Sequence, residues 1–408
     1  MTETTETATA PRPQYPFSSR GDCLAPELDD LRGECPVVPA LSNAGEDVWL
    51  VTGHAEARAV LTDSRVFDRA AVGLPDAPVQ DTPIYAPEVM NTMGFLRRAG
   101  LADEVRRALG PEHPDLPEEW VRAVVRRELA AMLAGPQPGD LQHHLATRVS
   151  GEVMCRLLGI PLADLPRVAE FADGDVTMLV PAEQTARNWA GMQSHMAGLI
   201  AQVRDGTAAS ARIPADGLMQ RLVARNDPDR GLTTGQLANI VGGLFVLGYE
   251  DMTSFLGVGA HNLLRRPWAL EELRADPATA DRHIEELLRL SVVLGNALAR
   301  IVTTDTEIAG RRLRAGDMVL ISTDAANHDP EVFPDPHRYD PRRSPNPHIR
   351  FGHGPHYCAG AHLARWVARI AFTELSHHRD LRLAVPPEQL EWRPNHMAIT
   401  LAALPVRW

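Results

Sequence analysis

The sequence contains no lysine, and its 41 basic residues, all arginine, are outnumbered by 53 acidic residues, which gives a formal net charge of -12. A chain with this balance lacks the basic face that nucleic acids require, so nucleic acid is excluded as its main partner. It also lacks any run of about 18 apolar residues, which excludes a membrane-spanning helix. The first 20 residues lack the apolar core of a secretion signal. We therefore expect a cytoplasmic protein with no membrane partner.

Cysteine is scarce as well. The chain has four cysteines and no CxxC pair; they are Cys23, Cys35, Cys155 and Cys358. This number and spacing do not suit a disulfide framework, and they predict a reduced, intracellular protein. A free cysteine is most often a small buried residue of the core.

The 408 residues, 44% of them apolar, predict a mostly α chain with a small β region late in the sequence. We expect a mobile tail over residues 1–20, one domain over residues 21–408, and a long loop over residues 70–93. The longest helical pattern covers residues 233–266. It begins with the capping-box spacing of Thr233 and Gln236, and its centre is apolar on nearly every face, so this helix should cross the interior.

One short stretch, "FGHGPHYCAGAHLAR" from Phe351 to Arg365, has an unusual composition. Three alternatives account for Cys358 within it: a buried core cysteine, a zinc ligand, or a ligand of another metal centre. The zinc alternative rests on four residues that are capable ligands, namely His353, His356, Cys358 and His362.

The surroundings of Cys358 favour a single thiolate ligand. Gly352 and Gly354 allow a tight loop, and a helical pattern begins directly after the cysteine. A thiolate in that place would face the positive end of the helix dipole, which lowers the pKa of a thiol. Gly360 permits the close approach of a flat, bulky group. A lone thiolate suits haem iron better than zinc, and thiolate ligation favours cleavage of the O–O bond.

The segment "FGHGPHYCAG" resembles the haem-binding loop of the cytochromes P450, with Phe351, Gly352, Gly354, Cys358 and Gly360 in the family's places. Three further stretches match in the right order: "EELLR", "AANHDPEVFPDPHRYDP" and "LGYEDMTS". The resemblance implies the cytochrome P450 fold, a helix-rich triangular prism that holds the haem between the long central helix and the cysteine loop. It also implies heme b as the cofactor and Cys358 as the axial ligand of its iron.

The resemblance assigns two groups of charged residues. Glu286 and Arg289, one helical turn apart, would form a buried structural network with Arg338; taken alone, the first two are also compatible with a solvated surface pair. The haem propionates would bind three cationic residues, namely His356, Arg300 and Arg106. Arg106 alone is equally compatible with an exposed helix arginine.

The long central helix departs from the family pattern. The family carries an acid followed by threonine, which relay protons to oxygen; here the acid is Glu250 and Asp251 stands in the threonine's place. Thr253 lies two positions on, turned about 200° around the helix, and cannot substitute. Two adjacent buried carboxylates predict at least one raised pKa, and we expect a proton-handling role. The alternative is that Glu250 bonds a neighbouring arginine or histidine while Asp251 faces a water-filled pocket. Gly248 would leave room for dioxygen beside the haem.

The resemblance also places a pocket for a mid-sized amphiphilic molecule. Its expected lining combines apolar and hydrogen-bonding residues: Leu247, Val293, Leu294, Asn296, His396 and Met397. No nucleotide-binding motif follows a strand, so electrons should come from a separate ferredoxin and its ferredoxin reductase. Four arginines near the cysteine loop would form a basic docking patch for an acidic ferredoxin, or else a solvated face; they are Arg342, Arg343, Arg350 and Arg365. We expect a monomer.

These observations predict a haem-thiolate monooxygenase that acts on a small natural product. Because the central helix lacks the usual threonine, oxidative C–C or C–N coupling or desaturation, for example on a cyclic dipeptide or another peptide-derived scaffold, is a serious alternative. Two alternatives from other classes are a haem-binding sensor or carrier without turnover and a zinc protein.

Overall fold

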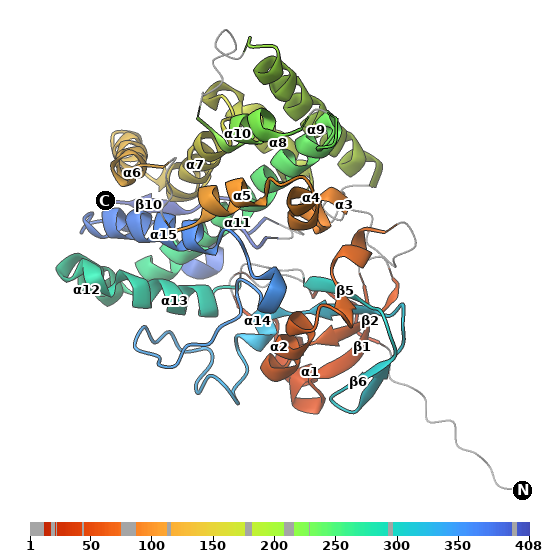
Figure 1. Ribbon diagram of the computed structural model, residues 1–408. Coiled ribbons are helices and arrows are strands. Elements are labelled where there is room, and N and C mark those ends of the chain that lie inside the picture. Colours follow the sequence, from red (N-terminus) through yellow and green to blue (C-terminus); the bar gives the residue numbers. More distant parts are fainter. Residues whose placement is uncertain are drawn as a thin grey trace, which may run out of the picture.

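The computed structural model describes residues 12–17, 21, 23–42, 45–74, 87–111, 116–175, 182–207, 216–227, 229–292, 297–393 and 398–408. Within this part the protein is helix-rich with small sheets, as the sequence predicts (Figure 1). Residues 1–11 and 18–20 of the predicted tail lie outside the described residues. Tyr15 is buried, and its N–H donates to the carbonyl of Leu41 at 2.8 Å, so this portion of the tail is packed against the sheet.

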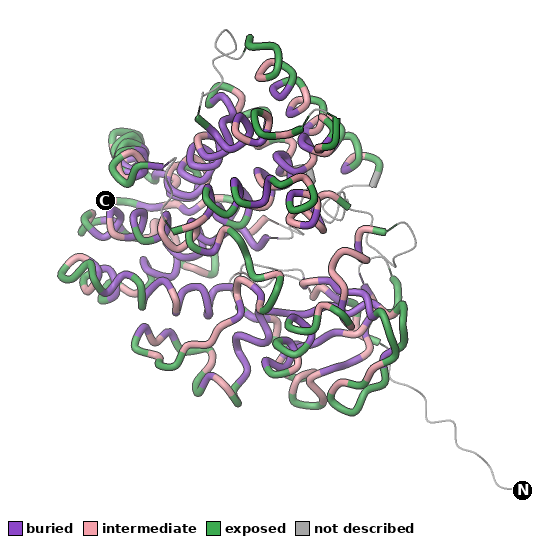
Figure 2. Tube along the Cα trace, in the orientation of Figure 1, coloured by how far each residue is buried: buried purple, intermediate pink, exposed green. Residues whose placement is uncertain are grey.

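The central helix, α11 (Thr234–Leu264), is buried along most of its length (Figure 2). Its predicted start is confirmed: the N–H of Gln236 donates to Thr233 Oγ1 at 3.2 Å, and the N–H of Thr233 donates to Gln236 Oε1 at 3.0 Å. This capping box satisfies two backbone donors that would otherwise have no partner. Because residues on nearly every face are apolar, the helix is stable only when other elements surround it.

Other helices pack around α11, and the most extensive contacts with it come from α9, α7 and the π-helical segment Gln142–Arg148, followed by α8. The helices of this part are α3 (Pro87–Met90), α4 (Thr92–Arg98), α5 (Ala102–Leu109), α6 (Glu118–Leu133), α7 (Val149–Leu158), α8 (Leu165–Asp175), α9 (Ala182–Arg204), α10 (Leu218–Arg225), α12 (Pro267–Ala275), α13 (Ala280–Leu290) and α15 (Ala361–Ser376). None of the helices in the described ranges is both long enough and apolar enough to cross a bilayer.

The main sheet lies to one side of these helices (Figure 1). Its strand order is β1 (Val37–Leu41), β2 (Asp47–Val51), β8 (Met318–Ile321), β5 (Leu298–Val302) and β3 (Phe67–Asp68). Only β2 and β8 pair in parallel among neighbours in this sheet. Three of its strands come from the first 70 residues, so the β region is less confined to the late sequence than predicted. The short helices α1 (Pro26–Glu34), α2 (His54–Thr62) and α14 (Thr323–Ala326) lie beside it.

The smaller sheets join β4 (Gly139–Asp140), β10 (Pro405–Arg407) and β9 (Arg382–Leu383), and pair β6 (Thr306–Ile308) with β7 (Arg311–Leu313). The predicted loop over residues 70–93 is only partly a loop. It begins with a 3-10 turn, Ala70–Gly73, and contains α3, while residues 75–86 lie outside the described ranges. Short helices of about one turn have too few residues to give a periodic pattern, so the sequence did not reveal them.

Candidate active site

The cysteine loop runs from Phe351 to Gly360, directly before α15. Gly352 and Gly354 have φ of +73° and +70°, the left-handed region that favours glycine. A Cβ on Gly354 would lie 2.7 Å from the carbonyl oxygen of Leu61, so a side chain there would also collide with α2. The N–H of Cys358 donates to the carbonyl of Phe351 at 2.9 Å and closes the loop. The predicted tight turn before the cysteine is therefore present.

The side chains of Cys358 and Asp251 open into the interior of the protein. Both have substantial accessible surface, yet burial is the largest effect on the pKa of each. The two facts agree if the side chains face a space inside the molecule rather than its outer surface. The negative charge of Asp251 also raises the pKa of Cys358, so the two groups lie near the same space. α11 and the cysteine loop thus bound one interior site from two sides.

Burial raises the pKa of the Cys358 thiol, whereas a hydrogen bond from the N–H of Gly360 and the charges of Arg69 and Arg365 act to lower it. A buried thiolate with such donors is suited to bind a metal ion, which replaces the proton. Gly360 leaves space beside the sulfur, because a Cβ there would project to 3.8 Å from Sγ. The residues present therefore fit a flat group bound through Cys358.

A cluster of basic residues lies beside this interior site and comprises Arg300, His356, Arg69 and Arg97, with one acid, Asp68, among them. Arg300 is buried, and burial followed by the charge of Arg69 lowers its pKa to about 10. Burial followed by the charges of Arg300 and Arg69 lowers the pKa of His356 to about 4. Arginines gathered around a buried member are unfavourable unless enough anions lie among them, and Asp68 supplies only one negative charge. The cluster therefore fits the two carboxylates of a haem.

The structure brings Arg300 and His356 together as predicted, but it does not bring Arg106 to them. Arg106 is on the surface of α5, where its Nη1 lies 2.5 Å from Asp103. The sequence analysis did not identify Arg69 or Arg97 as members of this cluster. Arg69 reaches the cluster because β3 pairs with β5, placing Asp68 opposite Ile301 and the next residue near Arg300. Such a register between strands distant in sequence is not visible in a single sequence.

The two adjacent acids of α11 face different surroundings, because consecutive helical residues point about 100° apart. Glu250 is buried, and its pKa is raised well above the usual value by burial and then by Asp173 of α8. Asp173 is itself held by Arg393 through two bonds of 3.0 and 2.8 Å. Burial raises the pKa of Asp251 to about 6, against the opposing charge of Arg350. The predicted rise in pKa is thus found for both acids, and Glu250 lies beside an arginine-bound carboxylate.

Gly248 allows α7 and α11 to pack closely, because a Cβ on it would lie 2.4 Å from Cε of Met154 on α7. The glycine is nevertheless only half-buried, and it lies three residues before Asp251 on the same face of α11. Its place beside the cofactor stays a prediction.

The buried charge network is present with one member changed. Glu286 and Arg289 are both 0% exposed and form a two-bonded pair, with distances of 2.9 and 2.7 Å. The third member is Arg343, whose Nε lies 3.3 Å from Glu286. Arg338, predicted for this place, has an exposed side chain and contributes only its carbonyl, which accepts from Arg289 at 3.2 Å.

Replacing Arg343 by glutamine should lower the free energy of unfolding by about 1–3 kcal/mol, because the largely buried carboxylate of Glu286 loses a charged hydrogen-bond donor. The same change at Arg338 should alter it by no more than about 0.5 kcal/mol. Denaturant unfolding of the two variants beside the parent protein measures both. Equal losses would contradict the assignment of Arg343 to the network.

One of the predicted substrate residues lies within the described part of the chain. Leu247 is half-buried on α11. The others lie outside the described residues: Val293, Leu294, Asn296, His396 and Met397.

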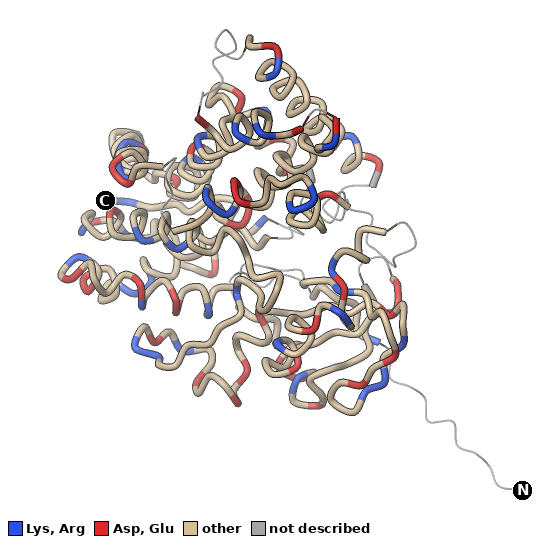
Figure 3. The backbone as a smooth tube through the Cα atoms, in the orientation of Figure 1, with Lys and Arg blue, Asp and Glu red and all other residues tan. Residues whose placement is uncertain are grey.

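The predicted basic patch is not a free surface. Arg350 is buried and paired with Asp324, Arg343 belongs to the network with Glu286, and Arg365 is paired with Glu285. Arg342 is 72% exposed and lies 3.1 Å from Glu272. Figure 3 shows both signs of charge interspersed over the helices. Three of these four arginines act mainly inside the protein, and the exposed Arg342 is paired with an acid, so the group provides little charge for docking an acidic partner.

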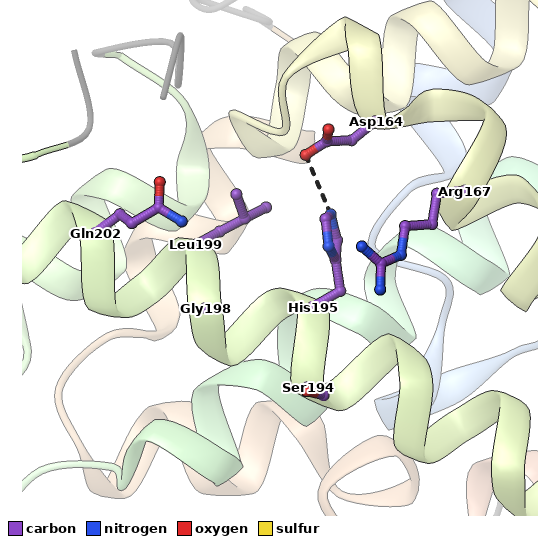
Figure 4. A pocket seen from close by; sticks show the side chains of 7 residues that line it. All are labelled: Asp164, Arg167, Ser194, His195, Gly198, Leu199 and Gln202. Atoms are coloured by element: carbon purple, nitrogen blue, oxygen red, sulfur yellow. Dashed lines mark ion pairs between the residues drawn. The ribbon is translucent and has the colours of Figure 1, made fainter. Parts of the chain in front are cut away.

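The zinc alternative has no support within the described ranges, where no three His, Cys, Asp or Glu side chains gather to hold a metal. A pocket of about 410 Å³ lies between α9 and the segment leading into α8. Figure 4 shows His195 facing Asp164, with Nε2 and Oδ2 3.1 Å apart. Its lining comes from neither α11 nor the cysteine loop, so it is separate from the candidate active site.

The interior thiol and the adjacent cations, on a helix-rich fold with a buried central helix, define a haem-thiolate protein. Comparison with known proteins gives the family: the sequence model of the cytochrome P450 family matches residues 175–405. The chain belongs to the cytochrome P450 family, and it is an oxidoreductase that uses haem with a cysteine thiolate ligand.

Three relatives indicate the range of reactions around this chain. Nocardicin C N-oxygenase of Nocardia uniformis subsp. tsuyamanensis is 36% identical over 97% of this chain and 98% of its own length. Mycocyclosin synthase of Mycobacterium tuberculosis is 31% identical over 97% of this chain and 98% of its own. The solved structure of SgvP, a putative thioether synthase involved in tailoring griseoviridin, superposes with a TM-score of 0.87 at 30% identity, covering 98% of this chain and 100% of that one.

Proposed function

We propose that this cytochrome P450 is a monooxygenase that oxygenates a small natural product, with electrons supplied by a separate ferredoxin and its reductase. Bound haem with a thiolate ligand supplies the activation of dioxygen. The similarity to an N-oxygenase over nearly the whole chain supports oxygen transfer. The observation that carries the proposal is the place of Asp251, an acid with a pKa of about 6 that faces the same interior site as Cys358.

Asp251 is the group of α11 best placed to supply a proton in this site. The residue after it, Met252, has no exchangeable proton on its side chain. Thr253 is buried, and its hydroxyl has no hydrogen-bond partner within the described residues, on a face about 200° from Asp251. Glu250, with its raised pKa, retains a proton one residue away. We infer that Asp251 delivers the proton at its carboxyl oxygen.

Replacing Asp251 by asparagine keeps the shape and removes the proton. The variant should bind substrate with nearly the parent affinity and lose rate by roughly 10²–10⁴-fold, the usual contribution of general acid catalysis. Turnover with an electron-donor system and a substrate titration, run in parallel, measure the two quantities. A variant that keeps the rate but changes affinity or selectivity would show that Asp251 only binds water or substrate.

The pH dependence follows from the same carboxyl. An acid that donates its proton is active in its protonated form, so the parent rate should fall as the pH rises through about 6. The pH profile of Asp251→Asn should lack this fall in rate near pH 6, while any other pH-dependent change of the parent profile should remain. A parent profile that is flat between pH 5 and 7, or a step that persists in the asparagine variant, would assign the proton to another group.

Oxidative coupling without oxygen insertion is the second candidate, favoured by the absence of a threonine at position 251 and by the names of two relatives, a mycocyclosin synthase and a putative thioether synthase. Turnover under isotope-labelled dioxygen separates the candidates. Label in the main product supports monooxygenation, and a product without label supports coupling or desaturation. In the second case Asp251→Thr, which restores the usual hydroxyl, should increase a hydroxylated side product.

A further inference from the structure

Arg365, in the second turn of α15, connects three elements beneath the cysteine loop. Its Nε donates to Glu285 Oε1 at 2.5 Å and its Nη2 to Glu285 Oε2 at 3.0 Å, which fixes the guanidinium against α13. Its remaining nitrogen, Nη1, donates to the hydroxyl of Tyr357 at 3.1 Å. One planar cation therefore ties two helices to the residue that directly precedes Cys358.

The same guanidinium also contacts the start of the loop. Its central carbon lies 4.5 Å from the centre of the Phe351 ring, a cation–π contact. The rings of Phe351 and Tyr357 meet nearly edge to face at 6.3 Å, and the carbonyl of Phe351 accepts from the N–H of Cys358. Arg365 thus contacts Phe351, which accepts the hydrogen bond that closes the loop, and Tyr357, which directly precedes its donor, Cys358.

Glu285, the acid that binds the guanidinium of Arg365, is firmly ionised. Burial alone would raise its pKa, but hydrogen bonds from His348, at 3.0 Å, and from Arg365 hold it at about 2. The guanidinium is therefore fixed by a charged partner throughout the physiological pH range. A surface ion pair of two long side chains is free to come apart, whereas this one has three further contacts that keep its geometry, to Tyr357, Phe351 and His348.

We propose that Arg365 is a positioning residue for the thiolate: the chain Glu285–Arg365–Tyr357 holds the cysteine loop in the shape that presents Cys358 Sγ to the haem iron, and its charges set the electron affinity of the bound haem. The inference rests on the haem-thiolate class of the protein and does not depend on the substrate or on the outcome of the reaction. The competing explanation is an ordinary ion pair that only joins α13 to α15.

The test compares Arg365→Gln and Glu285→Gln with the parent holoenzyme. In the reduced, carbon monoxide-bound protein, the thiolate-ligated band converts to the band of haem that has lost its thiolate ligand. Both variants should undergo this conversion roughly tenfold faster than the parent, because each loses charge-assisted hydrogen bonds. The reduction potential of the thiolate-ligated fraction should shift in opposite directions. Removing the cation disfavours the added electron and lowers the potential; removing the anion raises it.

Two controls separate positioning from general stability. Arg369→Gln, one turn further along α15 and 3.9 Å from the exposed Asp281, should change neither the conversion rate nor the potential. Tyr357→Phe keeps the ring and removes the hydroxyl, so it should speed the conversion without shifting the potential. The proposal is overturned if Arg365→Gln keeps the parent conversion rate, or if Arg365→Gln and Glu285→Gln shift the potential in the same direction, which would show loosening of the fold alone.

Discussion

A Cys358→His protein should fold and bind some haem, but its reduced, carbon monoxide-bound spectrum should lack the thiolate band and its oxidation of any substrate should fall to background. The physical reason is that an imidazole is a neutral ligand and lacks the electron density that a thiolate supplies to iron. Haem content, the spectrum and turnover of the purified variant measure this result together. Oxidation that survives the change would show that Cys358 is not the axial ligand.

The matched control is Cys155→Ser. Cys155 is buried in α7, and burial raises the pKa of its thiol to about 12, so it remains a neutral packing residue at physiological pH. Its replacement should leave the spectrum unchanged, apart from a modest loss of stability. An altered band in this variant would mean that the spectrum responds to general packing rather than to the ligand.

Glu286→Ala should lower the free energy of unfolding by about 3–5 kcal/mol, the usual effect of removing one partner from a buried ion pair. The change leaves Arg289, which is 0% exposed, and Arg343 without their carboxylate. It also removes the acceptor for the N–H of Asp340 and for Asn346 Nδ2. We expect weaker haem retention with the same variant, because the segment that carries these residues leads into the cysteine loop. Chemical unfolding and the rate of haem release measure both effects.

Glu271→Ala is the control for Glu286, since Glu271 is a largely exposed acid paired within one helix to Arg274. It should cost no more than about 1 kcal/mol. A Glu286→Ala protein that is stable, loaded with haem and inactive would instead give Glu286 a chemical role.

The features that the sequence predicted well depend on residues close together in the chain. The capping box at Thr233 and Gln236 requires a spacing of three, and the Glu286–Arg289 pair requires one helical turn. The cysteine loop requires glycines at fixed offsets from Cys358. In each case local geometry decides which atoms meet, so spacing alone carries the information.

The features that it missed depend on how distant elements pack. Arg343 replaces Arg338 in the charge network because the course of the loop, not the spacing, decides which side chain turns inward. Arg69 joins Arg300 through strand pairing, and Asp173 meets Glu250 because α8 crosses α11. Gly248 faces Met154, a contact between α11 and α7. No pattern within one segment reports such contacts, and only the residues' chemistry marks them as candidates.

The absorption spectrum of the purified protein, reduced and bound to carbon monoxide, tests the central claim most directly, because it reports the haem and the identity of its protein ligand in one measurement. The account predicts one haem per chain and a band at the long wavelength typical of haem bound to a cysteine thiolate, present in the parent and absent from Cys358→His. A haem-loaded parent whose band lies at the shorter wavelength of other ligands, or a parent and a Cys358→His protein with the same band, would contradict it.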